Sequence, residues 1–228
     1  MTLGLLASPV SAAAPKAAAP STGAPPACSY ADTTTTLPNI SQWQTTLLDS
    51  ALRVSSAYVP PLVQVSRAGF GGGFLVRPEV IADLSAMRRA AAAAGAPLAI
   101  VSAYRSYGAQ VSTFNGWVGQ SGYAAALLAS ARPGHSEHQL GTAIDFTTAG
   151  GRAPWDYDDW ATTKAGAWMA ANAVTYGFVL SYPDGATDTT CYQYEPWHYR
   201  YFGRTIAADM AASGLTTRGY LWAHGSGR

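Results

Sequence analysis

Apolar residues recur three to four positions apart in several parts of the chain. Two such stripes predict helices over residues 41–55 and 78–94, and further helices are expected over 107–117, 164–176 and 205–213. Pro78 suits a first helical turn, whereas Gly95 and Gly177 are typical of the residue after a last turn. The apolar run at 98–101 predicts a buried strand and that at 178–180 a short strand, and a further strand is expected over 143–146. Because strands and helices do not alternate regularly, the pattern favours an α+β fold.

The first 37 residues differ from the rest of the chain. An apolar run over residues 3–10 is followed by Ser11 and three alanines, so residues 1–14 are interpreted as a signal-peptide remnant. The first basic residue is Lys16, so either the signal is short or the start codon lies upstream; the alternative is an alanine-rich tail on a cytosolic protein. Residues 15–37, rich in Ala, Pro and Thr, predict a linker. We expect residues 38–228 to form a single domain that acts in the cell envelope or outside the cell.

The composition excludes several classes of partner. Charged residues make up 12% of the 228 residues and hydrophobic residues 48%, which supports a buried core. The formal net charge is +1 and the sequence has no basic run, so we expect no nucleic-acid partner. No stretch approaches the roughly 18 apolar residues of a membrane span. We therefore expect no membrane span. A monomer is also expected, although no feature of the sequence determines the oligomeric state.

The chain has two cysteines, Cys28 and Cys191. In an exported protein two cysteines most simply form one disulfide, which here would close a loop of roughly 160 residues and attach the N-terminal arm to the body. Two unpaired thiols are the alternative. A lipid anchor on Cys28 is disfavoured because Pro25 and Pro26 precede it and no apolar helix leads into it.

Histidine and glutamate residues concentrate in two short segments, 134–145 and 194–201. The first segment contains His138 and Asp145, and the second contains His198. If His138 and Asp145 bind one metal ion, the chain between them must fold back, because seven extended residues span about 23 Å whereas zinc ligands lie about 2 Å from the metal. Gly141 is the natural place for that turn. His198 would then supply a third ligand.

Two imidazoles and one carboxylate leave a fourth position for water on a tetrahedral zinc ion, which is the pattern of a catalytic site. Glu195 precedes His198 by three residues, and a turn at Pro196 could bring both side chains to the metal. A carboxylate there can remove a proton from water and pass it to a leaving amine. The alternative role for Glu195 is to orient His198. Taken separately, His138 and His198 are better explained as hydrogen-bonded core histidines.

These residues resemble a known family. The pattern Ser136-x-His138-x-x-Gly141-x-Ala143-x-Asp145, followed by Glu195-Pro-Trp-His198, is similar to the VanY-type D-alanyl-D-alanine carboxypeptidases. That family belongs to a group of zinc peptidases that includes D-Ala-D-Ala dipeptidases and shares its fold with the amino-terminal domain of hedgehog proteins. Residues 102–106 with Gln110, residues 176–178 and residues 199–203 fit the same pattern, so the resemblance covers residues 58–203.

The resemblance implies a small, mainly antiparallel sheet with flanking helices. It implies Zn²⁺ on His138, Asp145 and His198, with Glu195 as the catalytic base and acid. It also implies that Arg105 binds a peptide oxygen or stabilises the oxyanion of the reaction. Taken by itself, Arg105 could equally be a surface ion-pair residue.

Three further residues lie in the parts of the chain that carry the resemblance. The resemblance suggests that Gln110 and Ser136 position substrate. The alternatives are an ordinary helix-surface glutamine and a serine that braces the loop around His138. His135 has no ligand role in the pattern, so we expect it to be structural.

Together these features predict an exported bacterial zinc carboxypeptidase that removes the terminal D-Ala from peptidoglycan stem peptides. One rival is an L,D-carboxypeptidase that acts on the tetrapeptide stem, and nothing in the sequence resolves the pocket that would decide. An endopeptidase that cuts inside the stem is disfavoured because the chain has no repeated wall-binding module. A non-catalytic, zinc-containing binding module is disfavoured because it has no need of a proton acceptor such as Glu195.

Overall fold

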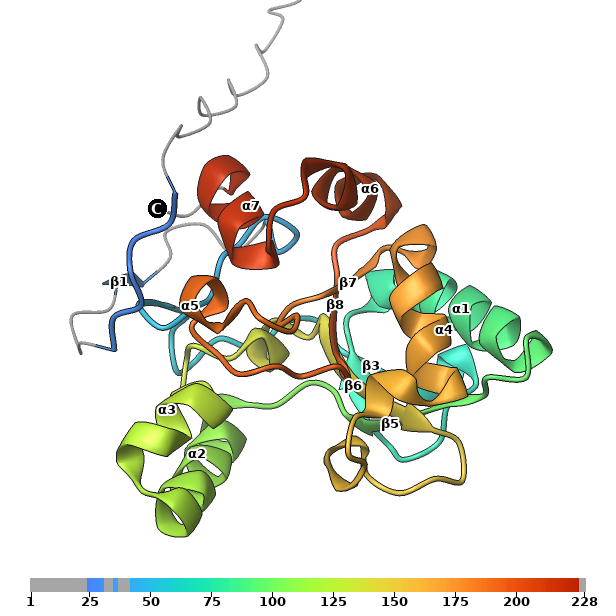
Figure 1. Ribbon diagram of the computed structural model, residues 1–228, viewed down its shortest axis with the longest axis horizontal. Helices are drawn as coiled ribbons and strands as arrows, with labels where there is room; N and C mark the ends of the chain where they lie inside the picture. Colours follow the sequence, from blue (N-terminus) through green and yellow to red (C-terminus); the bar gives the residue numbers. More distant parts are fainter. Residues whose placement is uncertain (1–23, 31–34, 37–41, 226–228) are drawn as a thin grey trace, which may run out of the picture.

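The computed structural model describes residues 24–30, 35–36 and 42–225 (Figure 1). The predicted signal-peptide remnant and most of the predicted linker lie outside the described residues. Within the linker, strand β1 (Thr35–Thr36) pairs in parallel with β2 (Leu52–Arg53). The arm is therefore attached to the body through backbone pairing as well as through the disulfide described below.

An antiparallel sheet forms the centre of the molecule. Its strands are β5 (Leu98–Ser102), β6 (Ala143–Thr148), β8 (His198–Tyr201) and β7 (Phe178–Leu180), in that spatial order. Each neighbouring pair is antiparallel. A separate hairpin joins β3 (Val63–Gln64) to β4 (Leu75–Val76). The predicted strands at 98–101, 143–146 and 178–180 and the predicted α+β, mainly antiparallel fold are confirmed.

Helices surround this sheet. The α-helices are α1 (Ile81–Ala93), α2 (Tyr107–Ser121), α3 (Tyr123–Ala129), α4 (Lys164–Asn172), α5 (Thr187–Thr190), α6 (Arg204–Ser213) and α7 (Thr217–His224). The 3-10 helices are η1 (Val65–Ala68), η2 (Pro78–Val80), η3 (Glu137–Leu140), η4 (Pro154–Asp156), η5 (Trp160–Thr162) and η6 (Ala173–Tyr176). Figure 1 shows α1 and α4 on one side of the sheet, α6 and α7 on another, and α2 with α3 as a pair that projects from the body.

Four of the predicted helices are present. The prediction over 78–94 corresponds to η2 followed by α1, and the prediction over 164–176 corresponds to α4 followed by η6. Gly95 and Gly177 follow these helices with φ of 72° and 81°, a conformation that glycine adopts readily. The short helices α3 and α7 were not predicted from the sequence, since helices of seven and eight residues carry little periodic signal.

The predicted helix over 41–55 is wrong for the described residues 42–55, which form turns, irregular chain and β2. Tertiary and local polar contacts take the backbone groups that a helix would pair. Arg200 donates hydrogen bonds to the carbonyl oxygens of Trp43 and Thr46, at 2.8 and 2.7 Å. The Asp49 carboxylate accepts from the backbone N–H groups of Ala51 and Leu52. An acidic side chain that bonds its own backbone in this way competes with helix formation.

Two apolar clusters hold these elements in place. The larger one packs the sheet against α1 and α4 and includes Leu84, Met87, Phe146, Met169 and Phe178. The second cluster gathers the apolar residues of the 42–55 segment against the C-terminal helices, with Leu47, Leu48, Phe202, Met210 and Leu221. The apolar spacing of the 42–55 segment thus marked residues that are buried, although they are not helical.

Cys28 and Cys191 form a disulfide, as the sequence predicted, with their Cα atoms 5.4 Å apart. The Tyr30 hydroxyl donates to the carbonyl oxygen of Cys191 at 2.6 Å. Arg218 in α7 donates to the carbonyl oxygen of Pro26 at 3.0 Å. The arm over residues 24–30 is thereby joined to the segment that leads from α5 to β8. Among the described residues, no helix has the length and apolar character needed to cross a bilayer.

Candidate active site

The three predicted metal ligands come together at the centre of the sheet. Asp145 in β6 and His198 in β8 are direct partners in the antiparallel ladder. His138 comes from η3, and Gly141, which follows that helix with φ of 74°, turns the chain back into β6. One ligand atom from each of the three side chains lies within 4.8 Å of the other two, and all three residues are buried. The turn predicted at Gly141 is therefore confirmed.

The two imidazoles each present one nitrogen to the site and have the other held outside it. His138 Nε2 lies 3.2 Å from Asp145 Oδ2, while His138 Nδ1 lies 2.6 Å from the carbonyl oxygen of Ala103. His198 Nδ1 lies 3.0 Å from Asp145 Oδ1, while His198 Nε2 lies 3.0 Å from Glu137 Oε2. Outer hydrogen bonds of this kind fix the tautomer of metal-binding histidines. The residues present thus fit a zinc ion, which prefers imidazole and carboxylate ligands.

The electrostatics of the three side chains follow from their burial and proximity. Burial would raise the pKa of Asp145, but the two histidines beside it hold that pKa well below its usual range. Burial lowers the pKa of His138. Burial would also lower the pKa of His198, but its hydrogen bonds to Asp145 and Glu137 outweigh this and raise the pKa to about 10. The Asp145 carboxylate is accordingly ionised and able to act as a ligand.

Glu195 lies beside the same histidine on the cleft side. The backbone N–H of His198 donates to the carbonyl oxygen of Glu195 at 3.0 Å, which closes the turn predicted at Pro196. Glu195 Oε2 lies 3.6 Å from His198 Nδ1. Burial and the nearby Asp145 charge raise the pKa of Glu195 to about 7, against the opposing charges of His198 and Arg105. A carboxyl group with this pKa can both accept and return a proton near neutral pH.

Glu137 is a site residue to which the sequence assigned no role. Its carboxylate accepts hydrogen bonds from Ser181 and Arg200 and lies 3.0 Å from His198 Nε2. Glu137 therefore contacts the outer nitrogen of His198, while the role of orienting His198 was offered by the sequence only as an alternative for Glu195. Its position next to His138 was the available signal, but the contact with His198 spans 61 residues and no local pattern reports it.

Arg105 is a residue of the cleft and not of the outer surface. Its guanidinium donates to Gln110 Oε1 at 2.8 Å and to Ser102 Oγ at 3.0 Å, and lies 3.7 Å from Asp145 Oδ2. Gln110 is fully buried and its amide donates to the carbonyl oxygen of Ala131, so it is not an ordinary helix-surface residue. Its side-chain oxygen accepts from Arg105, and a substrate role for Gln110 stays a prediction.

Ser136 and His135 lie at the same turn but face different surroundings. Ser136 is buried and lines the cleft together with His138. His135 is buried away from the cleft, and its Nδ1 lies 2.7 Å from the carbonyl oxygen of Asp49. The prediction that His135 is structural agrees with this contact, and a substrate role for Ser136 stays a prediction.

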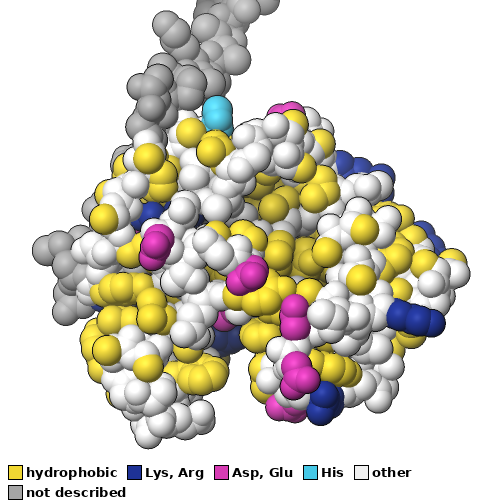
Figure 2. All heavy atoms as spheres, in the orientation of Figure 1, with side chains coloured by type: hydrophobic (Ala, Val, Ile, Leu, Met, Phe, Trp, Pro, Cys, Tyr) yellow, Lys and Arg dark blue, Asp and Glu magenta, His cyan; other side chains and the backbone are white. Residues whose placement is uncertain are grey.

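A cleft of about 570 Å³ opens onto the three ligands. One wall is α2, with Thr113, Trp117 and Gln120, and the opposite wall includes Trp155 and Trp197. Figure 2 shows it as a notch between the pair of helices α2 and α3 and the rest of the body, with charged side chains deep inside it. A ligand in this notch would therefore reach Glu195, Arg105 and the three ligands from one side.

Comparison with known proteins assigns the family. The model of the family described as "VanY: D-alanyl-D-alanine carboxypeptidase" matches residues 73–204, more than half of the chain. The chain belongs to the VanY family. This match contains His138, Asp145, Glu195, His198 and Arg105, so the site described above lies inside the family's own region.

Two curated relatives are similar over part of their length. The protein YodJ of Bacillus subtilis (strain 168) is 39% identical over 146 residues, 64% of this chain and 53% of YodJ. A D-alanyl-D-alanine carboxypeptidase of Enterococcus faecalis (strain ATCC 700802 / V583) is 36% identical over 89 residues, 39% of this chain and 31% of that protein. The chain thus spans about half and about a third of the lengths of these relatives.

Solved structures with the same fold include both kinds of carboxypeptidase. The LdcB LD-carboxypeptidase superposes with a TM-score of 0.72 at 32% identity, covering 87% of this chain and 94% of LdcB. VanYB in complex with D-alanine-D-alanine has a TM-score of 0.68 at 28% identity, covering 78% of this chain and 97% of VanYB. A variant of the VanY D,D-pentapeptidase from the VanB-type resistance cassette, in complex with Zn(II), gives the same TM-score and identity, over 78% of this chain and 99% of that chain.

Proposed function

We propose that the protein is a zinc-dependent D-alanyl-D-alanine carboxypeptidase that removes the terminal D-Ala from peptidoglycan stem peptides. The observation that carries this proposal is the position of Glu195, whose pKa is raised to about 7, beside three convergent metal ligands at the base of an open cleft. Family membership and the Zn(II) complex of VanY support the metal. The VanYB complex with D-alanine-D-alanine supports the substrate class.

In this proposal His138, Asp145 and His198 hold the zinc ion. When bound there, zinc supplies Lewis-acid chemistry, polarising the scissile carbonyl and lowering the pKa of water. Glu195 takes the proton from the attacking water on its carboxylate and later gives it to the departing amine of D-alanine. The raised pKa of Glu195 supports both transfers, because neither protonation state is strongly favoured near neutral pH.

Arg105 is proposed to bind a carbonyl or carboxylate oxygen of the peptide or the oxyanion that forms during the reaction. Its hydrogen bonds to Gln110 and Ser102 hold the guanidinium in one orientation before substrate arrives. A preorganised cation needs little rearrangement at the moment when negative charge develops, which is the condition for effective electrostatic stabilisation. Ser136 is proposed to contact the same peptide, since it lines the cleft next to His138.

A second candidate is L,D-carboxypeptidase activity on the tetrapeptide stem. The observation in its favour is the similarity to LdcB and to DacB of Streptococcus pneumonia, which are described as L,D-carboxypeptidases. The two activities differ in the configuration of the residue before the cut bond, while the zinc ligands and Glu195 would serve both.

We also propose that the protein acts outside the cytoplasm. The Cys28–Cys191 disulfide supports this location, because such bonds persist mainly in oxidising compartments.

Mass spectrometry of two muropeptides tests the function. The zinc-loaded protein is incubated separately with a pentapeptide stem and with a tetrapeptide stem, and Glu195→Gln serves as the inactive control. Loss of one alanine from the pentapeptide alone supports the D,D activity, whereas loss from the tetrapeptide supports the L,D activity. If zinc is bound and neither peptide changes, the proposed carboxypeptidase activity is wrong.

A further inference from the structure

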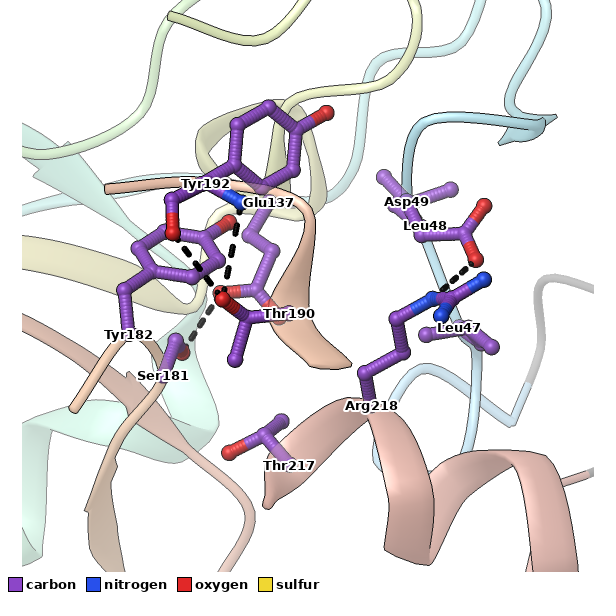
Figure 3. Close-up of a pocket in the computed structure, with 10 residues that line it drawn as sticks. All are labelled: Leu47, Leu48, Asp49, Glu137, Ser181, Tyr182, Thr190, Tyr192, Thr217 and Arg218. Carbon is purple, nitrogen blue, oxygen red and sulfur yellow. Dashed lines mark hydrogen bonds and ion pairs between the residues drawn. The ribbon is translucent and has the colours of Figure 1, made fainter. Parts of the chain in front are cut away.

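Glu137 is a buried carboxylate that takes no part in the proposed reaction. Only 3% of its surface is exposed, and it is not among the residues that line the cleft. It lies on the opposite side of His198, where it lines a small cavity of about 10 Å³ (Figure 3). A peptide in the cleft therefore cannot touch it, and any influence of Glu137 on the site must pass through His198.

The fold places two donors in line with this carboxylate. His198 and Arg200 are two residues apart in β8, so their side chains leave the same face of the strand. Glu137 uses one oxygen for each: Oε2 lies 3.0 Å from His198 Nε2, and Oε1 accepts from Arg200 Nη1 at 2.9 Å. Ser181 Oγ donates to Oε2 at 2.7 Å, as Figure 3 shows. These donors leave the carboxylate little freedom to rotate.

Arg200 is itself fixed by the fold. Its side chain is fully buried, and Nη2 donates to the carbonyl oxygens of Trp43 and Thr46. The positive guanidinium also compensates the charge of Glu137, which would otherwise be strongly disfavoured in the interior. The pair is thus a neutral unit, held by Ser181 and by the 42–55 segment, and its contact with the three proposed metal ligands is the hydrogen bond to His198.

We propose that Glu137 and Arg200 form a positioning pair that sets the tautomer and ring orientation of His198 and thereby strengthens zinc binding. Zinc binds a neutral imidazole, which keeps one ring proton. Because an ionised carboxylate can only accept a hydrogen bond, Glu137 would hold that proton on Nε2 and leave the lone pair of Nδ1 for the metal site. The ring of Tyr182 packs against the same imidazole at a tilt of 35°, with centroids 4.8 Å apart, and limits its rotation. The inference rests on the proposed zinc site, and it extends that site to residues that contact neither metal nor substrate.

The other histidine ligand, His138, has a different outer partner. His138 Nδ1 faces the neutral carbonyl oxygen of Ala103 at 2.6 Å. His198, by contrast, faces a carboxylate, which makes the imidazole a stronger electron donor toward a metal ion. Loss of the Glu137 charge should therefore weaken zinc binding even where the protein still folds.

The molecule supplies a matched control in the same region. Asp49 and Arg218 form a second buried carboxylate–guanidinium pair, with Asp49 Oδ2 2.7 Å from Arg218 Nε, and Asp49 lines the same small cavity as Glu137 (Figure 3). Asp49 is 2% exposed and Arg218 is 4% exposed. The described hydrogen bonds of this pair go to the backbone of the N-terminal arm, of Thr189 and of residues 51–52, and to His135, and none goes to a proposed metal ligand. Asp49→Asn therefore removes a comparable buried charge without touching His198.

The test compares zinc affinity in Glu137→Gln, Asp49→Asn and the unchanged protein, by competition against a chromophoric zinc chelator at fixed pH. We expect Glu137→Gln to raise the zinc dissociation constant about 10- to 100-fold, the range found when outer partners of metal ligands are removed. Asp49→Asn should stay within about twofold of the unchanged protein, although both variants lower the unfolding temperature of the metal-free form. Equal zinc affinity in all three proteins would overturn the positioning pair and leave Glu137 as a folding partner of Arg200 alone.

Glu137→Asp is the variant to measure if Glu137→Gln does not fold. Glu137→Asp retains the negative charge beside Arg200 but withdraws the carboxylate from His198 by one methylene. We expect it to fold and to bind zinc several-fold more weakly, and unchanged affinity would contradict the proposal. If the unchanged protein binds no zinc, the proposed function fails as well. If it binds zinc and hydrolyses muropeptides while both Glu137 variants bind equally tightly, only the positioning pair is wrong.

Discussion

Two glutamates, the half-buried Glu195 and the buried Glu137, lie on opposite sides of His198, and their surroundings shift their pKa values in opposite directions. On the cleft side, burial and the charge of Asp145 raise the pKa of Glu195 to about 7. On the inner side, burial would also raise the pKa of Glu137, but Arg200, His198 and Ser181 lower it to about 2. The same residue type thus becomes a proton-transfer group in one region and a permanent anion in the other.

The difference lies in the number of fixed donors around each carboxylate. Three side chains from β8 and the segment after β7 are directed at Glu137. Glu195 instead lies 3.6 Å from the nearest histidine nitrogen and lines a cleft open to ligand. Burial alone therefore does not assign a role to a carboxylate; the donors that accompany burial decide between proton transfer and support.

Removing His198 should have the largest effect on zinc binding and activity, because His198 contacts Glu195 on the cleft side and Glu137 on the inner side. We expect His198→Ala to lose stoichiometric zinc and all measurable hydrolysis, since the site then keeps only two of its three protein ligands. Metal content after dialysis, measured by elemental mass spectrometry, checks the first result. His135→Ala is the matched control, a buried histidine whose loss should leave zinc in place.

Glu195→Gln should lower the rate of hydrolysis without weakening zinc binding, which is the opposite pattern to that expected of the Glu137 variants. The amide keeps the shape of the carboxylate but cannot take up the proton, so kcat should fall by about 10² to 10⁴. Zinc affinity should change little, in contrast to the Glu137 variants, because Glu195 is not one of the three ligands. Full activity in Glu195→Gln, with zinc bound, would remove Glu195 from its role as the base.

A smaller effect is expected from the support of Arg105. In Gln110→Leu the guanidinium loses the acceptor that lies 2.8 Å from Nη1. Hydrogen bonds to charged groups contribute about 1.5 kcal/mol or more, so kcat/KM should fall about tenfold. Gln120→Leu, in the same helix and the same cleft, is the control and should have less effect. A larger loss in Gln120→Leu than in Gln110→Leu would place the important cleft contact further along α2.

The sequence predicted the parts of the site that are encoded locally. Gly141 was predicted to turn the chain between His138 and Asp145, and its positive φ agrees with that expectation. The pairing of Asp145 with His198 was not predicted, because no strand was expected over 198–201. Spacing and turn-forming residues thus indicated how the chain folds back between His138 and Asp145, whereas the ligand set was implied by the resemblance to the VanY-type family.

The parts that could not be predicted depend on contacts between distant residues. The helix expected over 41–55 is absent from its described part because Arg200, more than 150 residues away, takes two of its carbonyl oxygens. Glu137 was visible in the sequence, but its contact with His198 exists only after β8 has joined the sheet. Both failures involve Arg200, a buried charge whose partners no local pattern reports.

The smallest effect on catalysis is expected from His135, on the inner side of the site. Burial lowers the pKa of His135 to about 4, because the ring is removed from water and lies near Arg132 and Arg53, against the hydrogen bond to the carbonyl oxygen of Asp49. The unfolded chain, with a histidine pKa near 6.5, therefore binds more protons than the folded protein between about pH 6.5 and pH 4. The contribution of His135 to stability is fully present above about pH 6.5 and is lost as the pH falls toward 4.

The expected loss of stability is about 2 kcal/mol across this interval. This is below the upper limit of about 3.5 kcal/mol, which is about 1.4 kcal/mol for each pH unit between 6.5 and 4. Urea unfolding of the metal-free protein at several pH values measures it, with His135→Gln as the comparison that removes the titrating group. Carboxylates and the three metal ligands titrate in both proteins, so the difference between the two curves isolates His135. The curves should converge as the pH falls from 6.5 to 4, and parallel curves would mean that His135 is protonated as readily in the folded protein as in the unfolded chain.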